Sequence, residues 1–113
     1  MLFLMQFQMT DAEIDHVNAN QDNLQDYYKA KLDSLMGRPA AGLALGRYKG
    51  VATIDTDDKE HAFSVMNGVG DDSIVTRYLP TMSMSVGDIL VTDNGDAFIC
   101  AAFGFEPTTL ATS

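Results

Sequence analysis

The fold is decided by the stretch Ile89-Leu90-Val91-Thr92-Asp93-Asn94-Gly95-Asp96-Ala97-Phe98-Ile99-Cys100-Ala101-Ala102-Phe103. Asn94-Gly95 is typical of a tight hairpin turn, and β-rich runs lie on both sides of it. The second run, 97–103, is apolar on both faces, so we expect it to be central in its sheet or to lie between a helix and a partner. This stretch predicts a mainly antiparallel sheet.

Two helical segments are predicted before this sheet. Thr10-Asp11-Ala12-Glu13 has the spacing of a capping box, which predicts a helix over about 11–18 with Ile14 and Val17 on its inner face. A second helix, over about 21–36, is predicted by core-facing apolar residues at helical spacing: Leu24, Tyr28, Leu32 and Leu35. Gly37 and Pro39 favour its end.

The remaining elements complete an α+β fold in a single domain, 1–113. A strand is expected over 2–8 and another over 48–54, with Val51 and Thr53 on one face and Ala52 and Ile54 on the other. A helix over about 57–67 begins among acidic residues and turns Ala62, Phe63 and Met66 inward. An edge strand is expected within 73–79. The predicted regions are a mainly helical part (1–36), a Gly/Ala-rich connector (37–47), a β-α-β-hairpin core (48–106) and a frayed tail (107–113).

Composition narrows the class of protein. The chain has 113 residues, and 46% of them are hydrophobic, which excludes outright disorder. It has no apolar run long enough for a membrane span. One cysteine excludes an internal disulfide framework. The opening Met-Leu-Phe-Leu-Met run lacks the positive flank of a signal peptide, so we expect a cytoplasmic protein whose true start is Met1, Met5 or Met9.

Charge is unevenly distributed along the chain. Seven basic and sixteen acidic residues give a net charge of −9, which argues against direct binding to nucleic acid. Every basic residue lies between positions 29 and 77. This pattern is typical of a solvated surface, and the alternative is an acidic face that meets a basic partner or imitates nucleic acid. The candidate residues of such a face are Asp55, Asp57, Asp58, Glu60, Asp71 and Asp72.

The sequence carries no enzyme signature. His16 and His61 are predicted to point to solvent, and neither has a second ligand at metal-binding spacing. Cys100 lies mid-strand among apolar residues and is expected to be a small buried hydrophobe. We therefore predict no catalytic residue, no metal and no cofactor.

Two segments carry a resemblance. Val51-Ala52-Thr53-Ile54-Asp55-Thr56-Asp57-Asp58-Lys59-Glu60-His61-Ala62-Phe63-Ser64-Val65-Met66-Asn67 is followed by Ser83-Met84-Ser85-Val86-Gly87-Asp88-Ile89, Asn94-Gly95 and Phe103-Gly104-Phe105. This pattern resembles a widespread group of small uncharacterised proteins encoded by bacteriophages and other mobile elements. It covers about residues 48–106, whereas 1–47 fall outside it and the loop 68–80 is short. The resemblance implies a phage-like origin and a compact β-α-β-hairpin unit, with no activity to transfer.

The Ser-x-Ser-Val-Gly-Asp element has a structural interpretation. We expect the Ser83 and Ser85 side chains to hydrogen-bond nearby backbone, Gly87 to supply a permissive turn, and Asp88 to accept backbone amides there. Asn94 and Gly95 form the turn of the hairpin.

The expected function is that of a phage-like accessory protein that binds a host protein and has no catalytic activity. Candidate contacts are the apolar residues expected to be exposed, Met82, Met84, Phe103 and Phe105. The alternatives are an acidic DNA mimic that inhibits a nucleic-acid-binding host factor, and a structural or homo-oligomeric phage protein. A homodimer is favoured among oligomers because strand 97–103 needs cover on both faces.

Overall fold

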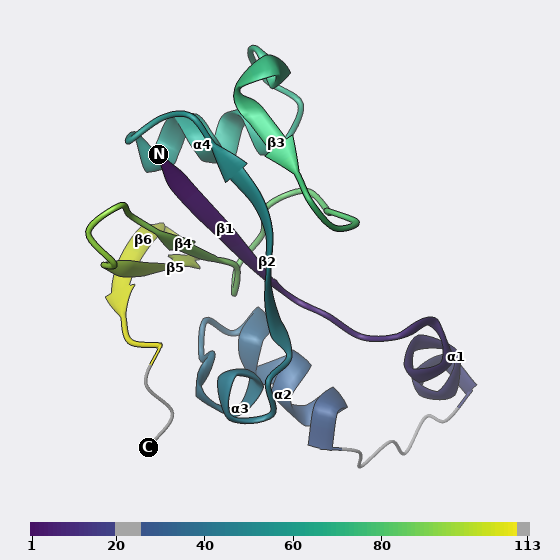
Figure 1. The fold of residues 1–113 in the computed structure, drawn as a ribbon. Coiled ribbons are helices and arrows are strands. Elements are labelled where there is room, and N and C mark those ends of the chain that lie inside the picture. The colour runs from purple at the N-terminus through teal and green to yellow at the C-terminus, as the bar shows by residue number, and fades with distance from the viewer. Residues whose placement is uncertain (20–25, 111–113) are drawn as a thin grey trace.

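The computed structural model describes residues 1–19 and 26–110, which form an α+β fold around a six-stranded sheet (Figure 1). The strands are β1 (Leu2–Phe7), β2 (Tyr48–Ile54), β3 (Val75–Arg77), β4 (Ile89–Val91), β5 (Ala97–Ala101) and β6 (Gly104–Thr108). The helices are α1 (Asp11–Ala19), α2 (Asp26–Leu35), α3 (Ala40–Ala44) and α4 (Lys59–Met66), with a 3-10 turn η1 (Asp72–Ile74). The strand order is β3-β2-β1-β4-β5-β6, and all neighbours are antiparallel. The predicted fold class is confirmed.

The predicted hairpin joins β4 to β5. Gly95 has a φ of +86°, which its missing side chain permits, and its N–H donates to the carbonyl of Thr92 at 2.9 Å. Leu90 pairs with Phe98 across the two strands. The hairpin predicted from Asn94-Gly95 is therefore confirmed.

The end of the chain differs from the prediction. Strand β5 ends at Ala101 and not at residue 103, because the chain turns at Ala102-Phe103 and returns as β6. The prediction of a frayed tail from Pro107 is wrong for Pro107 and Thr108, which lie in β6. Proline is tolerated there because β6 is the edge of the sheet and Pro107 needs no outward N–H.

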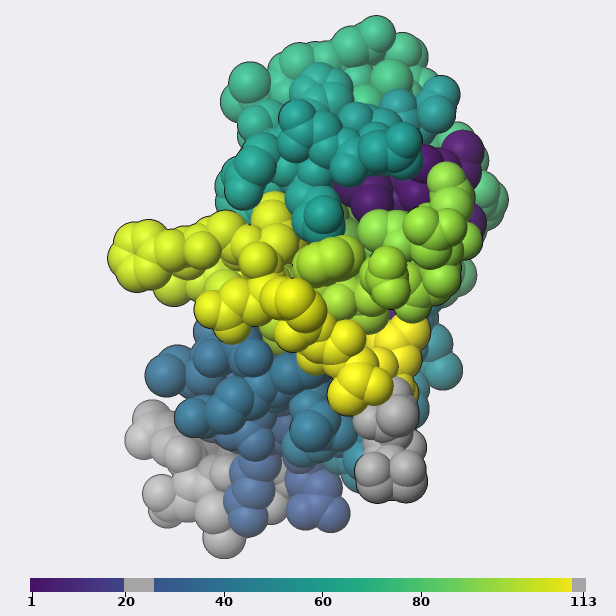
Figure 2. Space-filling view, turned by 90° about the vertical axis from the view of Figure 1, so that its left-hand side faces the viewer, coloured from purple at the N-terminus to yellow at the C-terminus, as the bar shows by residue number. Residues whose placement is uncertain are grey.

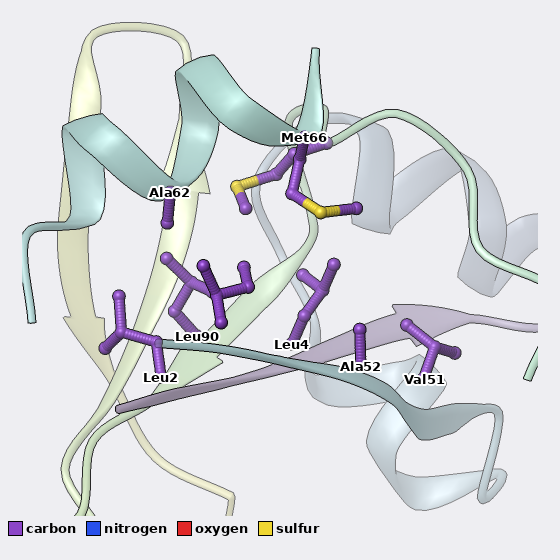
Figure 3. Packing of buried hydrophobic residues seen from close by; sticks show 9 residues of the cluster. Leu2, Leu4, Val51, Ala52, Ala62, Met66 and Leu90 are labelled. Carbon is purple, nitrogen blue, oxygen red and sulfur yellow. The ribbon is translucent and has the colours of Figure 1, made fainter. Parts of the chain in front are cut away.

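The first strand of the chain is central in the sheet, where Leu4 pairs with Ala52 of β2 and with Leu90 of β4. Its register against β2 shifts by one residue between Leu4 and Met5, which leaves Val51 as an extra residue in β2. Val51 and Ala52 therefore point to the same side (Figure 3). The predicted strict alternation of Val51 with Ala52 is wrong, because the bulge interrupts it.

Helix α4 covers one face of the sheet. Ala62 and Met66 point from the helix toward the side chains of the strands below (Figure 3). Asp58 begins the helix by accepting hydrogen bonds from the N–H groups of Glu60 and His61, as acids at a helix start predict. Phe63 is only partly buried at the edge of this core. The buried residues of the cluster are Leu2, Leu4, Val51, Ala52, Ile54, Ala62, Met66, Met84 and Leu90.

Helices α2 and α3 cover the other face, at the end of the molecule away from α4 (Figure 1). Ala30 of α2 packs among the buried residues Phe7, Tyr48, Ile89, Ala97 and Ile99. The predicted apolar stripe of α2 is wrong, since Leu32 and Leu35 are each 45% exposed and Tyr28 is half-buried, whereas Ala30 and Ser34 are buried. Leu24 and the predicted helical residues 21–25 lie outside the described residues.

Two further N-terminal expectations are corrected. Helix α1 buries no residue, and Ile14 is exposed, so no inner apolar face exists there. The residues 37–47, predicted as a connector, contain α3. A Cβ added to Gly42 would lie 2.9 Å from the rings of Phe7 and Tyr48, so a glycine lets this short helix approach the sheet.

The predicted edge strand is confirmed but shortened to β3, because Ser73 and Ile74 belong to η1.

Candidate functional site

The tip of the β5–β6 hairpin carries the most exposed large apolar side chain among the described residues. Phe103 is 98% exposed in the two-residue turn, and Gly104 follows it with a φ of +86°. Figure 2 shows this tip, in yellow-green, projecting from the side of the molecule. An aromatic ring held in water on a short, paired turn gains no folding free energy from burial, which is the situation of an anchor residue before it meets a partner.

The other three candidate contact residues do not join Phe103. Met82 is 77% exposed, but it lies beside Gln6 and Phe7 at the far end of β1. Met84 is 2% exposed in the core under α4, so its prediction as an exposed contact is wrong. Phe105 is half-buried and packs against that same core. Strand alternation turns Phe105 inward, whereas Phe103 lies in the turn.

A hollow of about 160 Å³ adjoins the hairpin tip. Its walls include Phe63 of α4, Ala101 of β5 and Phe105 of β6. Glu60 also lines it, and its carboxylate lies near the hairpin, 3.9 Å from the position that a Cβ on Gly104 would take. The tip thus combines a projecting ring with a small apolar hollow that has an acidic wall.

The six acidic candidates are all exposed, but the carboxylates of four of them form hydrogen bonds or ion pairs with other groups of the chain. Asp57 accepts a hydrogen bond from the terminal amine of Met1 at 2.6 Å, which lowers the pKa of that carboxyl. Asp58 and Asp71 cap α4 and η1, and Asp72 pairs with Arg77 at 3.0 Å. Within residues 1–19 and 26–110, Asp55 and Glu60 alone of the six have carboxylates without a hydrogen bond or ion pair. A phosphate-like array needs more free carboxylates than these.

The Ser-x-Ser-Val-Gly-Asp element forms a tight turn before β4. Gly87 has a φ of +96°, and a Cβ there would lie 2.1 Å from the carbonyl oxygen of Ser34, so only glycine fits. Asp88 accepts the N–H of Ser85 at 3.0 Å, as expected. The Ser83 and Ser85 hydroxyls make no hydrogen bond within the described part of the chain, so that expectation is wrong; both side chains are exposed.

A buried polar network around this turn was missed by the sequence reasoning. Gln6 donates to Asp88 Oδ2 at 3.1 Å and to the carbonyl of Met82 at 2.9 Å, and it accepts the Met82 N–H at 3.1 Å. Tyr48 donates to the carbonyl of Gly87 at 2.6 Å and lies 2.7 Å from Ser34 Oγ. The one sequence signal was a glutamine inside an otherwise apolar strand.

The electrostatics of the buried groups follow from desolvation. Burial raises the pKa of Asp88, although the hydrogen bonds from Ser85 and Gln6 and the charge of Lys31 partly oppose this. Burial, followed by the negative charges of Asp88 and Glu60, raises the pKa of Cys100 to about 11. The Cys100 thiol is therefore protonated near neutral pH, which confirms it as a small buried hydrophobe and makes it a poor nucleophile.

His16 and His61 are exposed on α1 and α4, as expected. No group of three or more His, Cys, Asp or Glu residues able to hold a metal ion occurs in the described ranges. None of the helices in these ranges has the length and apolar character that crossing a membrane requires. Comparison with family models, with curated proteins and with solved structures finds no match to the chain. The resemblance to phage-encoded proteins stays a prediction.

Proposed function

We propose that the protein acts by binding another protein, without a catalytic step, and that the tip of the β5–β6 hairpin is the contact. The supporting observation is the 98% exposure of Phe103. Aromatic residues supply a large share of the binding free energy at interfaces when a partner pocket desolvates them fully. A single isolated ring also avoids the large exposed patch that would make the free protein aggregate.

The surroundings of Phe103 favour a partner with an apolar pocket and a basic rim. The chain has a net charge of −9, and Glu60 lines the hollow beside the tip. The aliphatic stem of a partner lysine or arginine fits the apolar walls of this hollow, with its charged head near Glu60. Opposite charges at a rim raise the association rate and exclude wrong partners.

The resemblance to phage-encoded proteins favours a bacterial host protein as this partner and the host cytoplasm as the place of action. That part of the proposal rests on residues 51–67 and 83–105 of the sequence alone. The DNA-mimic alternative is less favoured, because four of the six candidate carboxylates already bond to groups of this chain.

A homodimer is less favoured than a different protein as the partner. Strand 97–103 was expected to need cover from a partner, yet Ala97 and Ile99 are buried beneath α2 and α3, and Cys100 is buried on the opposite face. Lys59 covers Phe98, with its ammonium 4.0 Å from the ring centroid. Within this segment only Ala102 and Phe103, at its end, are exposed.

Capture of partners from a bacterial lysate tests the proposal. The wild-type protein is compared with Phe103→Ala and with Met36→Ala, in which another exposed apolar side chain, outside the hairpin, is shortened. We expect Phe103→Ala to lose the captured protein and Met36→Ala to keep it. Binding that survives Phe103→Ala and instead collapses between low and physiological salt would support the acidic mimic.

A further inference from the structure

A second feature, independent of the hairpin tip, is a cavity of about 250 Å³ between β1, α2 and the segment 82–88. It is smaller than the roughly 300–1,000 Å³ of pockets that hold drug-sized molecules, so it suits only a compact ligand. Its lining residues are Gln6, Phe7, Lys31, Leu35, Met82, Ser83, Ser85 and Asp88.

Asp88 gives the cavity a buried acceptor with an unused oxygen. The residue is 7% exposed, and both of its hydrogen bonds, from Gln6 and from Ser85, reach the same oxygen, Oδ2. Oδ1 receives no hydrogen bond from the described residues. A buried carboxyl oxygen without a donor is costly, so this position favours a ligand that brings a donor, above all an ammonium group.

Lys31 and two hydroxyls give the same cavity an anion-binding side. The Lys31 ammonium lies 5.3 Å from the centroid of the Phe7 ring and forms no ion pair with any described carboxylate, Asp88 included. The Ser83 and Ser85 hydroxyls also lack partners within the described residues. An ammonium with two free hydroxyls suits a carboxylate.

The rest of the lining is apolar. Phe7 is buried beneath α2, and Leu35 and Met82 are 45% and 77% exposed. A ligand with an apolar side chain would cover part of these exposed surfaces and gain from their burial.

From the meeting of Asp88 and Lys31 in a small, partly apolar cavity, we propose that the protein binds a free α-amino acid with an apolar side chain. The amino group of the ligand pairs with Asp88 Oδ1. Its carboxylate meets Lys31 and the hydroxyls of Ser83 and Ser85, and its side chain lies against Phe7, Leu35 and Met82.

Titration of the full chain, labelled with nitrogen-15, tests this with L-leucine as the probe. We expect the amide resonances of Gln6, Met82 and Asp88 to shift and saturate. Two fragments of the probe serve as controls: 4-methylpentanoate lacks the amino group, and isopentylamine lacks the carboxylate. Each should bind at least about tenfold more weakly than L-leucine, because each loses one charged contact.

Two lysine variants provide the matched comparison. Lys31→Met should weaken L-leucine binding about tenfold or more, whereas Lys29→Met, which removes an exposed charge from the same helix, should change it less than about twofold. Asp88→Asn should also weaken binding. The proposal is overturned if about 10 mM L-leucine shifts none of these resonances, if either fragment binds as well as L-leucine, or if the two lysine variants behave alike.

Discussion

Gln6 Nε2 lies 3.1 Å from Asp88 Oδ2, and this hydrogen bond joins the central strand β1 to the turn that begins β4. Both side chains are buried. The Gln6 amide also exchanges two hydrogen bonds with the backbone of Met82, so it holds the segment before that turn in the manner of a neighbouring strand. The cost of this arrangement is a carboxyl group removed from water.

Replacing Asp88 with asparagine should reveal that cost as a dependence on pH. Burial raises the pKa of Asp88 above 3.8, so the native state holds this proton more tightly than the unfolded state does. The resulting stabilisation is full below about pH 4 and is lost as the pH rises through the folded-state pKa. Asp88→Asn does not titrate there. We therefore expect the free energy of unfolding of the variant, relative to wild type, to rise between about pH 4 and pH 8.

Urea unfolding at both pH values measures this difference. Asp15→Asn, an exposed site on α1, is the control and should show a smaller change with pH. If the difference in free energy of unfolding between Asp88→Asn and wild type stays constant or shrinks as the pH rises, burial does not raise the pKa of Asp88.

Two glycines with similar backbone angles should respond differently to alanine. Gly87 and Gly95 have φ values of +96° and +86°, so alanine is strained at both, at a cost of about 1–2 kcal/mol. At Gly87 the added Cβ also lies 2.1 Å from the Ser34 carbonyl oxygen, whereas at Gly95 nothing lies within 4 Å. We expect denaturant unfolding to show a loss of about 3–5 kcal/mol for Gly87→Ala and about 1–2 for Gly95→Ala. Equal losses would mean that α2 does not pack on this turn.

The attachment of α1 should depend on one ion pair. Arg47 donates two hydrogen bonds of 2.6 Å to Glu13, and these lower the pKa of Glu13 from 4.5 to about 2. A depressed pKa means that this contribution is present above about pH 4.5 and is lost as the pH falls toward 2. Because α1 buries no residue, Glu13→Gln should speed hydrogen exchange of the α1 amides and leave the melting temperature nearly unchanged.

Glu13 also accepts the N–H of Thr10. The matched control is therefore Asp11→Asn, which changes an acidic residue in the same first turn of α1 that does not pair with Arg47. Slow exchange of the α1 amides in Glu13→Gln would show that another contact holds the helix.

Cys100 should be inert in the folded protein. It is 3% exposed, and its pKa of about 11 leaves little thiolate at about pH 8. A thiol reagent such as dithionitrobenzoate should react with it only after denaturant unfolds the chain. Rapid stoichiometric reaction of the native protein would place the residue at an accessible surface instead.

Elements with strong local signals were predictable from the sequence. The Asn94-Gly95 turn determined the β4–β5 hairpin, and Asp58 marked the start of α4, because a turn and a helix cap each depend on a few adjacent residues. Exposure of Phe103 was also expected, but its place in a turn was not, since the run 97–103 reads as one continuous strand.

Features that depend on distant contacts were missed. Leucines were expected to define the buried face of α2, yet Ala30 and Ser34 do so, because the close approach of Ser34 to Gly87 admits only small residues. The bulge at Val51 depends on the partner strand β1 and has no local signal. Gln6 and Asp88 lie 82 positions apart, so no spacing in the sequence connects them.

The contact through the hairpin tip is tested most directly by crosslinking from position 103 in living bacteria. Phe103 is replaced by the photoreactive analogue benzoylphenylalanine, which keeps an aromatic side chain at the tip, and Met36 is replaced in the same way as a control. We predict that light produces one discrete adduct with another protein from position 103 and none of that mass from position 36. An adduct of twice the chain mass, or equal labelling from both positions, would contradict a protein partner held by Phe103.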